Sequence, residues 1–172
     1  MRKITIGLNT KDINRAIKEI NKYKQELEVK VKECEKRIAE ELKQEIQLNF
    51  NSAVVDDQIN GGTRQAYVTV EITPLYSMSV VIVKGEDAVF CEFGAGVYHN
   101  GSVGSSPNPL GNELGLTIGS YGKGKGKQQA WGYYDTNGEL VITRGTPASM
   151  PMYHAIMTIT QKSIEIAREV FK

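Results

Sequence analysis

Glycines and lysines that could cradle a phosphate group stand together at Gly119-Ser120-Tyr121-Gly122-Lys123-Gly124-Lys125. A P-loop needs glycine N–H groups, a lysine, and then a Ser or Thr hydroxyl that ligates the metal. Here Gly126 stands where that hydroxyl is needed, and no strong buried strand precedes the tract. Gly94-Ala95-Gly96 begins like a dinucleotide-binding turn, but His99 takes the place of the third glycine. Neither tract predicts a nucleotide cofactor.

Titratable side chains give no catalytic pattern. His99 and His154 lack an HExxH context or a paired carboxylate, so we interpret them as a loop residue and a helix-face residue. Asp87 and Glu92 could in principle form an acid–base pair, yet nothing near them suggests a nucleophile or an oxyanion site. We therefore predict no catalytic residue, no metal site and no cofactor, and a protein that is not an enzyme.

Cysteine usage and charge restrict the class of protein further. Cys34 and Cys91 are far apart and show no metal-ligand spacing, which predicts two free thiols in a reducing compartment. A net charge of +1 argues against tight non-specific binding to nucleic acid, which needs a clear excess of basic residues. The N-terminus lacks an apolar signal core, and no run approaches the roughly 18 apolar residues of a membrane helix. We expect a soluble protein that is intracellular or is assembled inside a cell.

A long helical region is predicted near the N-terminus, because 11–50 contains neither Pro nor Gly and its apolar residues recur at helical spacing. The pattern weakens near Tyr23 to Glu26, so the region is either one helix or two. Its apolar stripe could be a coiled-coil seam or the face of a helix that covers a sheet. We favour the second, because after Cys34 the repeat drifts to steps of four. The stripe consists of Ile13, Ile17, Ile20, Leu27, Val31, Cys34, Ile38, Leu42 and Ile46.

The middle of the chain predicts a polar loop over 51–64, followed by strands at 66–72 and 78–83. Ala88 to Phe93 is either a short helix with Asp87 as its cap or another strand, and we favour the helix. The glycine-rich tract 94–128 predicts a long loop, of a length that is usually functional or disordered in a compact domain.

The C-terminal part predicts a hairpin over 131–143, because Asn137-Gly138 suits the positive-φ positions of a tight turn. Ser149 is the expected N-cap of a final helix over 149–172, with Pro151 in its first turn. The sequence thus predicts a single α+β domain over 1–172. An antiparallel sheet of four or five strands (66–93 and 131–143) would be packed by the helices at 10–50 and 149–172.

Two short motifs carry a resemblance to a known family. The first is Val89-Phe90-Cys91-Glu92-Phe93-Gly94-Ala95-Gly96; the second is Arg144-Gly145-Thr146-Pro147-Ala148 followed by Pro151-Met152-Tyr153, which opens the final helix. In this order, after a long N-terminal helix, they resemble the tail-component family of long-tailed bacteriophages, the neck or tail-completion proteins. The chain departs from that family in reading Asn51 to Asp57 where many relatives have an Ala-Pro-x-Asp-Thr-Gly type of turn, and Ala95 where Thr is frequent.

The resemblance implies a structural subunit of a head–tail connector, in a ring that is expected to be hexameric and through which double-stranded DNA passes. The implied partners are further copies of the chain, other neck proteins, and the tail terminator or tail tube. Contact with DNA in the lumen would be non-specific, and no membrane is involved. The implied location is the neck or tail of the virion, with assembly in the host cytoplasm.

Two groups of site residues follow. Glu92, Phe93 and Gly94 in the first motif, and Arg144, Gly145 and Pro147 in the second, are expected to fix two corners or a subunit boundary, and we predict that Glu92 and Arg144 form an ion pair. Lys123, Lys125 and Lys127 alternate with glycine and are expected to form a mobile positive arm that faces DNA or a neighbouring protein. The alternative function is a nucleic-acid-binding module that uses this arm.

Overall fold

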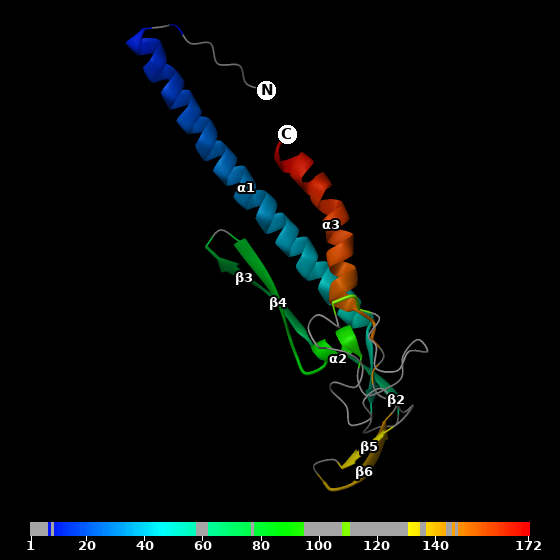
Figure 1. The fold of residues 1–172 in the computed structure, drawn as a ribbon. Coiled ribbons are helices and arrows are strands. Elements are labelled where there is room, and N and C mark those ends of the chain that lie inside the picture. Colours follow the sequence, from blue (N-terminus) through cyan, green and yellow to red (C-terminus); the bar gives the residue numbers. More distant parts are fainter. Residues whose placement is uncertain are drawn as a thin grey trace.

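A single long helix dominates the computed structural model, which describes residues 7, 9–57, 62–76, 78–94, 108–110, 131–134, 137–143, 146 and 148–172. This helix, α1, runs from Thr10 to Ser52 without a break (Figure 1). Asn9 begins it, because its side-chain oxygen accepts the backbone N–H of Asp12 at 2.8 Å. The sequence left open one helix or two, and the chain forms one.

The strands of the described residues form two-stranded sheets. β1 (Val54–Asp57) pairs with β2 (Gly62–Gln65), β3 (Thr69–Leu75) with β4 (Met78–Lys84), and β5 (Trp131–Tyr134) with β6 (Leu140–Thr143), each pair antiparallel. The prediction of a mixed helix and antiparallel-strand fold is confirmed. The prediction of one sheet of four or five strands is wrong, because the described strands form three separate two-stranded sheets.

The hairpin β1–β2 lies where a loop was expected. Helix α1 continues through Ser52, and β1 begins two residues later at Val54. Val54 and Val55 are β-branched residues that favour an extended chain, and Val55 is buried in the core. The predicted loop over 51–64 is therefore wrong for its described residues, 51–57 and 62–64. The loop prediction for 94–128 falls mostly outside the described residues.

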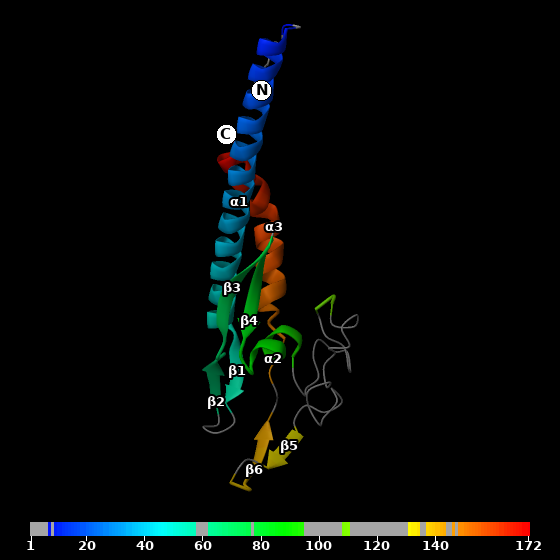
Figure 2. The same ribbon diagram turned by 90° about the vertical axis from the view of Figure 1, so that its left-hand side faces the viewer.

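Two shorter helices complete the fold, α2 (Ala88–Phe93) and α3 (Pro151–Val170), and both confirm the sequence-based expectation. The β3–β4 hairpin and α3 both lie along the C-terminal half of α1 (Figures 1 and 2). The core forms where these elements meet, and Phe50 of α1 is completely buried at its centre. Its buried members are Ile46, Phe50, Ala53, Val55, Val70, Ala88, Cys91 and Ala155.

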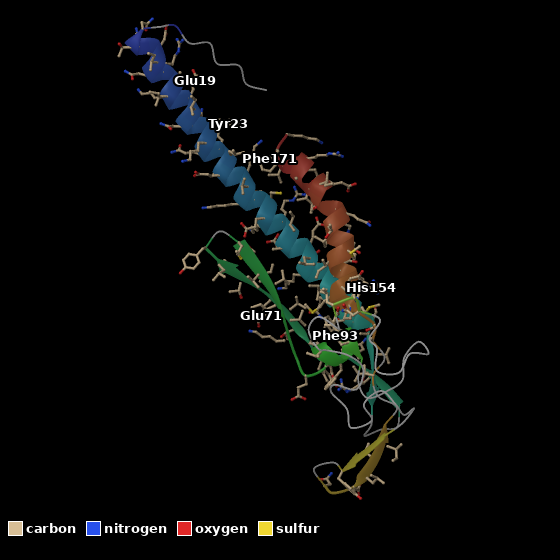
Figure 3. All side chains as sticks on the ribbon, in the orientation of Figure 1. Glu19, Tyr23, Glu71, Phe93, His154 and Phe171 are labelled. Atoms are coloured by element: carbon tan, nitrogen blue, oxygen red, sulfur yellow. The ribbon has the colours of Figure 1, made fainter. Side chains whose placement is uncertain are left out.

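The N-terminal part of α1 extends beyond this body (Figure 1). Figure 3 labels Phe171 near the end of α3 and, farther along α1, Tyr23 and Glu19 on the projecting part. The large apolar side chains of this part, including Ile17 and Ile20, are exposed, whereas the small side chain of Ala16 is buried. The interpretation of α1 as a helix that covers a sheet therefore applies only to its C-terminal part.

We expect Phe50→Ala to lower the free energy of unfolding by about 3–5 kcal/mol, because it removes a fully buried ring and leaves a cavity. Leu48→Ala, two residues away on an exposed position, is the matched control and should stay within about 0.5 kcal/mol of the wild type. Urea unfolding followed by circular dichroism measures both. Equal effects of the two substitutions would contradict the assignment of the core.

Candidate functional site

The carboxylate of Glu92 lies buried between α2 and the start of α3. Its Oε2 accepts the backbone N–H of Met152 at 2.8 Å, and its Oε1 accepts that of Tyr153 at 3.0 Å. Oε1 also accepts the side-chain N–H of Asn108 at 2.7 Å. Met152 and Tyr153 stand in the first turn of α3, whose N–H groups have no partner within the helix. Glu92 thus serves as the cap of a helix that begins about sixty residues later in the chain.

The segment before α3 returns hydrogen bonds to α2. The backbone N–H groups of Ser149 and Met150 donate to the carbonyl oxygen of Cys91, at 2.8 and 3.1 Å. The Ser149 hydroxyl donates to the same oxygen at 3.3 Å. The two helices therefore supply hydrogen-bond partners to each other. A carbonyl oxygen near the end of α2 accepts the N–H groups that precede α3, and the Glu92 side chain accepts N–H groups in the first turn of α3. We name this set of hydrogen bonds the α2–α3 junction.

The expected capping by Ser149 is wrong. The residue at the N-cap position is Met150, in the left-handed region with a φ of 51°, and its side chain makes no capping hydrogen bond. Pro151 occupies the first helical position, where its missing N–H costs little. Pro151 also joins the junction to α1, because its carbonyl oxygen accepts the side-chain N–H of Asn49 at 3.0 Å.

Burial controls the charge state of Glu92. Burial raises the pKa of its carboxyl group, while the N–H groups of Met152 and Tyr153, the Asn108 amide and the nearby His154 lower it. The effect of burial is the larger, so the pKa lies above the usual range for a glutamate. Glu92 is held as a structural acceptor whose two oxygens are both occupied.

Asp87 forms a second buried node, and it is not the side-chain cap of α2 that the sequence predicted. Its carboxylate accepts two N–H groups of Arg64, at 2.7 and 3.0 Å, and the backbone N–H of Tyr67 at 2.8 Å. The Arg64 guanidinium also lies over the Tyr67 ring, 4.6 Å from its centroid. Burial raises the pKa of Asp87, but these hydrogen bonds and the charge of Arg64 outweigh it, so the pKa lies below its usual range. This node fixes β2 and the start of β3 against α2.

Cys91 is fully buried, and burial raises the pKa of its thiol to about 11. A thiol in that state is a poor nucleophile, so Cys91 contributes to packing. Among the described residues, no three His, Cys, Asp or Glu side chains gather as metal ligands would. No helix within the same residues is long and apolar enough to cross a membrane.

The predicted site residues divide into two groups. Glu92 lies in the junction, with Phe93 buried beside it and Gly94 at a φ of 78°, a backbone conformation that favours glycine. Arg144, Gly145 and Pro147 lie outside the described residues, as do Lys123, Lys125 and Lys127. The predicted Glu92–Arg144 ion pair therefore remains a prediction. The described partners of Glu92 come instead from Asn108 and from the first turn of α3.

No local pattern in the sequence indicates Arg64 or Asn108 as partners of the buried carboxylates. Each lies in a segment read as loop, and each binds a carboxylate at least sixteen residues away. One signal was available, because Asp87 precedes a short apolar helix and Glu92 lies within it, and an acid buried at such a place needs nearby donors.

An apolar groove opens between α1, β4 and α3, with a volume of about 520 Å³. Phe171, which follows α3, lines the groove and lies beside α1 (Figure 3). The apolar side chains that line it are Val31, Cys34, Ile38, Ala39, Leu42, Ile46, Val81, Met152, Ile156 and Phe171.

Comparison of the chain with models of protein families, with curated proteins and with solved structures finds no match.

We expect Glu92→Gln to lower the free energy of unfolding by about 1–3 kcal/mol, because the new amide NH₂ would face an N–H donor in either orientation. Glu165→Gln, on an exposed position of α3, is the matched control and should have almost no effect. Urea unfolding at pH 7 compares them. A wild-type midpoint for Glu92→Gln would show that the junction does not stabilise the fold.

The Asp87 node predicts a loss of stability in acid. A carboxyl group whose pKa is lowered by folding contributes stability that is fully present above its unfolded pKa of about 3.9. That contribution disappears as the pH falls through the lower pKa of the folded protein. We expect Asp87→Asn to be less stable than wild type at pH 7, and the difference to shrink below about pH 4. Thermal unfolding between pH 2 and 7 tests this, with the exposed Glu86→Gln as control; a difference that is constant with pH would contradict it.

Proposed function

We propose that the chain is a structural subunit of a bacteriophage head–tail connector, in a neck or tail-completion ring through which double-stranded DNA passes. One observation carries the proposal. The two motifs on which the family resemblance depends meet in the fold, because Glu92 of the first accepts the N–H groups of Met152 and Tyr153, which follow the second. Because two motifs sixty residues apart complete one junction, their presence supports an architecture shared with the tail-component family rather than a chance resemblance to it.

The charge of the chain agrees with such a role. A ring that lets DNA slide through must not hold it tightly, and a subunit with a net charge of +1 meets that requirement. A monomer that bound DNA strongly would need a clear excess of basic residues.

The shape of the subunit also supports assembly. A helix of 43 residues extends beyond a small body and carries exposed apolar side chains (Figures 1 and 3). Exposed apolar rows of this kind are typical of surfaces that become covered in a complex. The proposed partners are further copies of the chain in a hexameric ring, other neck proteins, and the tail terminator or tail tube, within the virion.

The proposed role is structural rather than enzymatic. Both buried carboxylates serve as hydrogen-bond acceptors for the fold, Asp87 for Arg64 and Tyr67 and Glu92 for α3. Cys91 is more buried than Cys34, and its raised pKa keeps its thiol protonated. These groups are used for stability, which supports a scaffold.

Native mass spectrometry and electron microscopy of the purified chain, alone and mixed with a bacteriophage tail-tube protein as the proposed partner, test the proposal. We expect ring-shaped particles of six copies in at least one of the two samples. A chain that stays monomeric in both would contradict it. Tight, salt-sensitive DNA binding by that monomer would instead favour the nucleic-acid-binding alternative.

Replacing Lys123, Lys125 and Lys127 together by Ser tests the basic arm. Three phosphate contacts in one subunit would make the logarithm of the DNA-binding constant fall against the logarithm of the salt concentration with a slope of roughly −2.7, at about −0.9 for each phosphate. Binding by one subunit would be weak, and a ring would repeat the contacts. We expect the triple variant to fold normally and to reduce the yield of DNA-filled, tailed particles. Wild-type yields would show that the arm is only a linker.

A further inference from the structure

The apolar repeat of α1 changes at the point where the helix enters the body. From Ile13 to Ile38 the stripe positions alternate in steps of four and three, the repeat of a heptad, with Lys24 at one of them. After Ile38 the steps are four, through Leu42 and Ile46 to Phe50. A repeat of 3.5 residues keeps one face toward a partner helix over many turns, whereas steps of four drift around the helix.

The heptad part is the part that the rest of the described chain leaves exposed. Ile20 is 51% exposed, and its neighbours along the row are exposed to a similar extent. We name this row the heptad stripe; it consists of Ile13, Ile17, Ile20, Leu27 and Val31, with Lys24 between the third and fourth. The part of α1 after Ile38, where the apolar residues recur in steps of four, contributes Ile46 and Phe50 to the core. The change of repeat therefore separates a face used within the chain from a face that is available to another helix.

We propose that the heptad stripe binds the same stripe on a second copy of this chain, with the two α1 helices packed in parallel as a short coiled coil. In heptad notation Ile17, Lys24 and Val31 occupy a, and Ile13, Ile20 and Leu27 occupy d. Ile17 and Val31 at a and Leu27 at d match a two-stranded parallel pair, and a lysine at a single a position specifies the oligomer state, whereas Ile13 and Ile20 depart from the Leu expected at d. The inference stands on α1 and does not depend on the connector ring.

The charges beside the stripe favour a second copy in the parallel direction. The flanking g position holds Lys30 and the e position holds Glu28 and Glu35. In a parallel pair each g residue faces the e residue of the next heptad in the other helix, so Lys30 of each copy faces Glu35 of the other. An antiparallel pair places e beside e and g beside g, and forms neither of these ion pairs.

Arg37, one heptad after Lys30, marks where the seam ends. Its guanidinium donates to Glu169 of α3 in the same chain at 2.7 Å, so this flank of α1 is already covered by α3. Phe171 of α3 also lies in the groove with Val31 and Cys34. The second helix therefore has room along α1 from Ile13 to about Val31.

Lys24 limits the strength of the pair. A lysine at one a position reduces coiled-coil stability and specifies the register. Its ammonium group lies 4.0 Å from Glu28 of the same helix, which offsets part of the repulsion between the two copies. A moderate and reversible association is the expected result.

Sedimentation velocity of the full chain and its variants tests the inference. We expect Ile20→Glu with Leu27→Glu to raise the dissociation constant by about a hundredfold or more, since four apolar side chains leave the pair. Val29→Glu is the matched control, because Val29 is also on α1 and is 68% exposed but lies on the opposite face at f. We expect Lys24→Ile to strengthen association into a discrete dimer by about tenfold or more.

The outcomes separate this inference from the proposed ring. An unchanged dissociation constant in the Ile20→Glu, Leu27→Glu variant would overturn the inference and leave the connector proposal intact. Dimers that the variant abolishes, with no ring under any condition, would support the inference and count against the connector. Equal effects of the double variant and Val29→Glu would overturn the inference.

Disulfide formation tests the direction. In a Cys34→Ser background, Ile13→Cys should cross-link between copies on mild oxidation, because equivalent d positions face each other in a parallel pair. Cross-linking only in a mixture of Ile13→Cys and Val31→Cys chains would show an antiparallel pair and overturn the proposed arrangement.

Discussion

The first turn of α3 needs an acceptor for its N–H groups, and the rest of the body is arranged around the residue that supplies it. Met150 approaches in a left-handed conformation and offers no side-chain cap. Glu92 takes over that role from α2, and the Cys91 carbonyl binds the segment before the helix. Asn49 adds α1 through the Pro151 carbonyl. Three helices are joined here by polar groups that would each be costly to bury without a partner.

The two buried carboxylates show how the partner decides the charge. Asp87 precedes α2 and Glu92 lies in its last turn, and for both carboxyl groups burial acts to raise the pKa. Asp87 binds the cationic Arg64, which stabilises the charged form and brings its pKa below the usual range. The hydrogen-bond partners of Glu92 are neutral N–H groups, with His154 as a weak favourable charge, and its pKa is raised. Asp87 therefore stabilises the fold most near neutral pH, whereas ionised Glu92 remains under a desolvation cost.

Helix α1 has two parts with different packing. Its last turns complete the core with Ile46 and Phe50, whereas its first turns extend past the end of α3 (Figure 1). The hydrophobic repeat changes between these two parts, from steps of four and three to steps of four. Most helical stability in proteins comes from tertiary packing of an apolar face, and within the described chain only the last turns of α1 have such packing for their large apolar side chains.

The sequence by itself determined the local elements: the helical region of α1, the hairpin around Gly138, the short α2 and the final helix after Pro151. It left open whether α1 is one helix or two. These elements depend on periodicity, turn residues and caps within a few positions of one another. Only the tertiary structure decided that the strands form three separate hairpins, that Glu92 rather than Ser149 caps α3, and that Arg64 neutralises Asp87. Each of these depends on which segments the shared core brings together. A hydrogen bond between residues sixty positions apart leaves no trace in the local pattern.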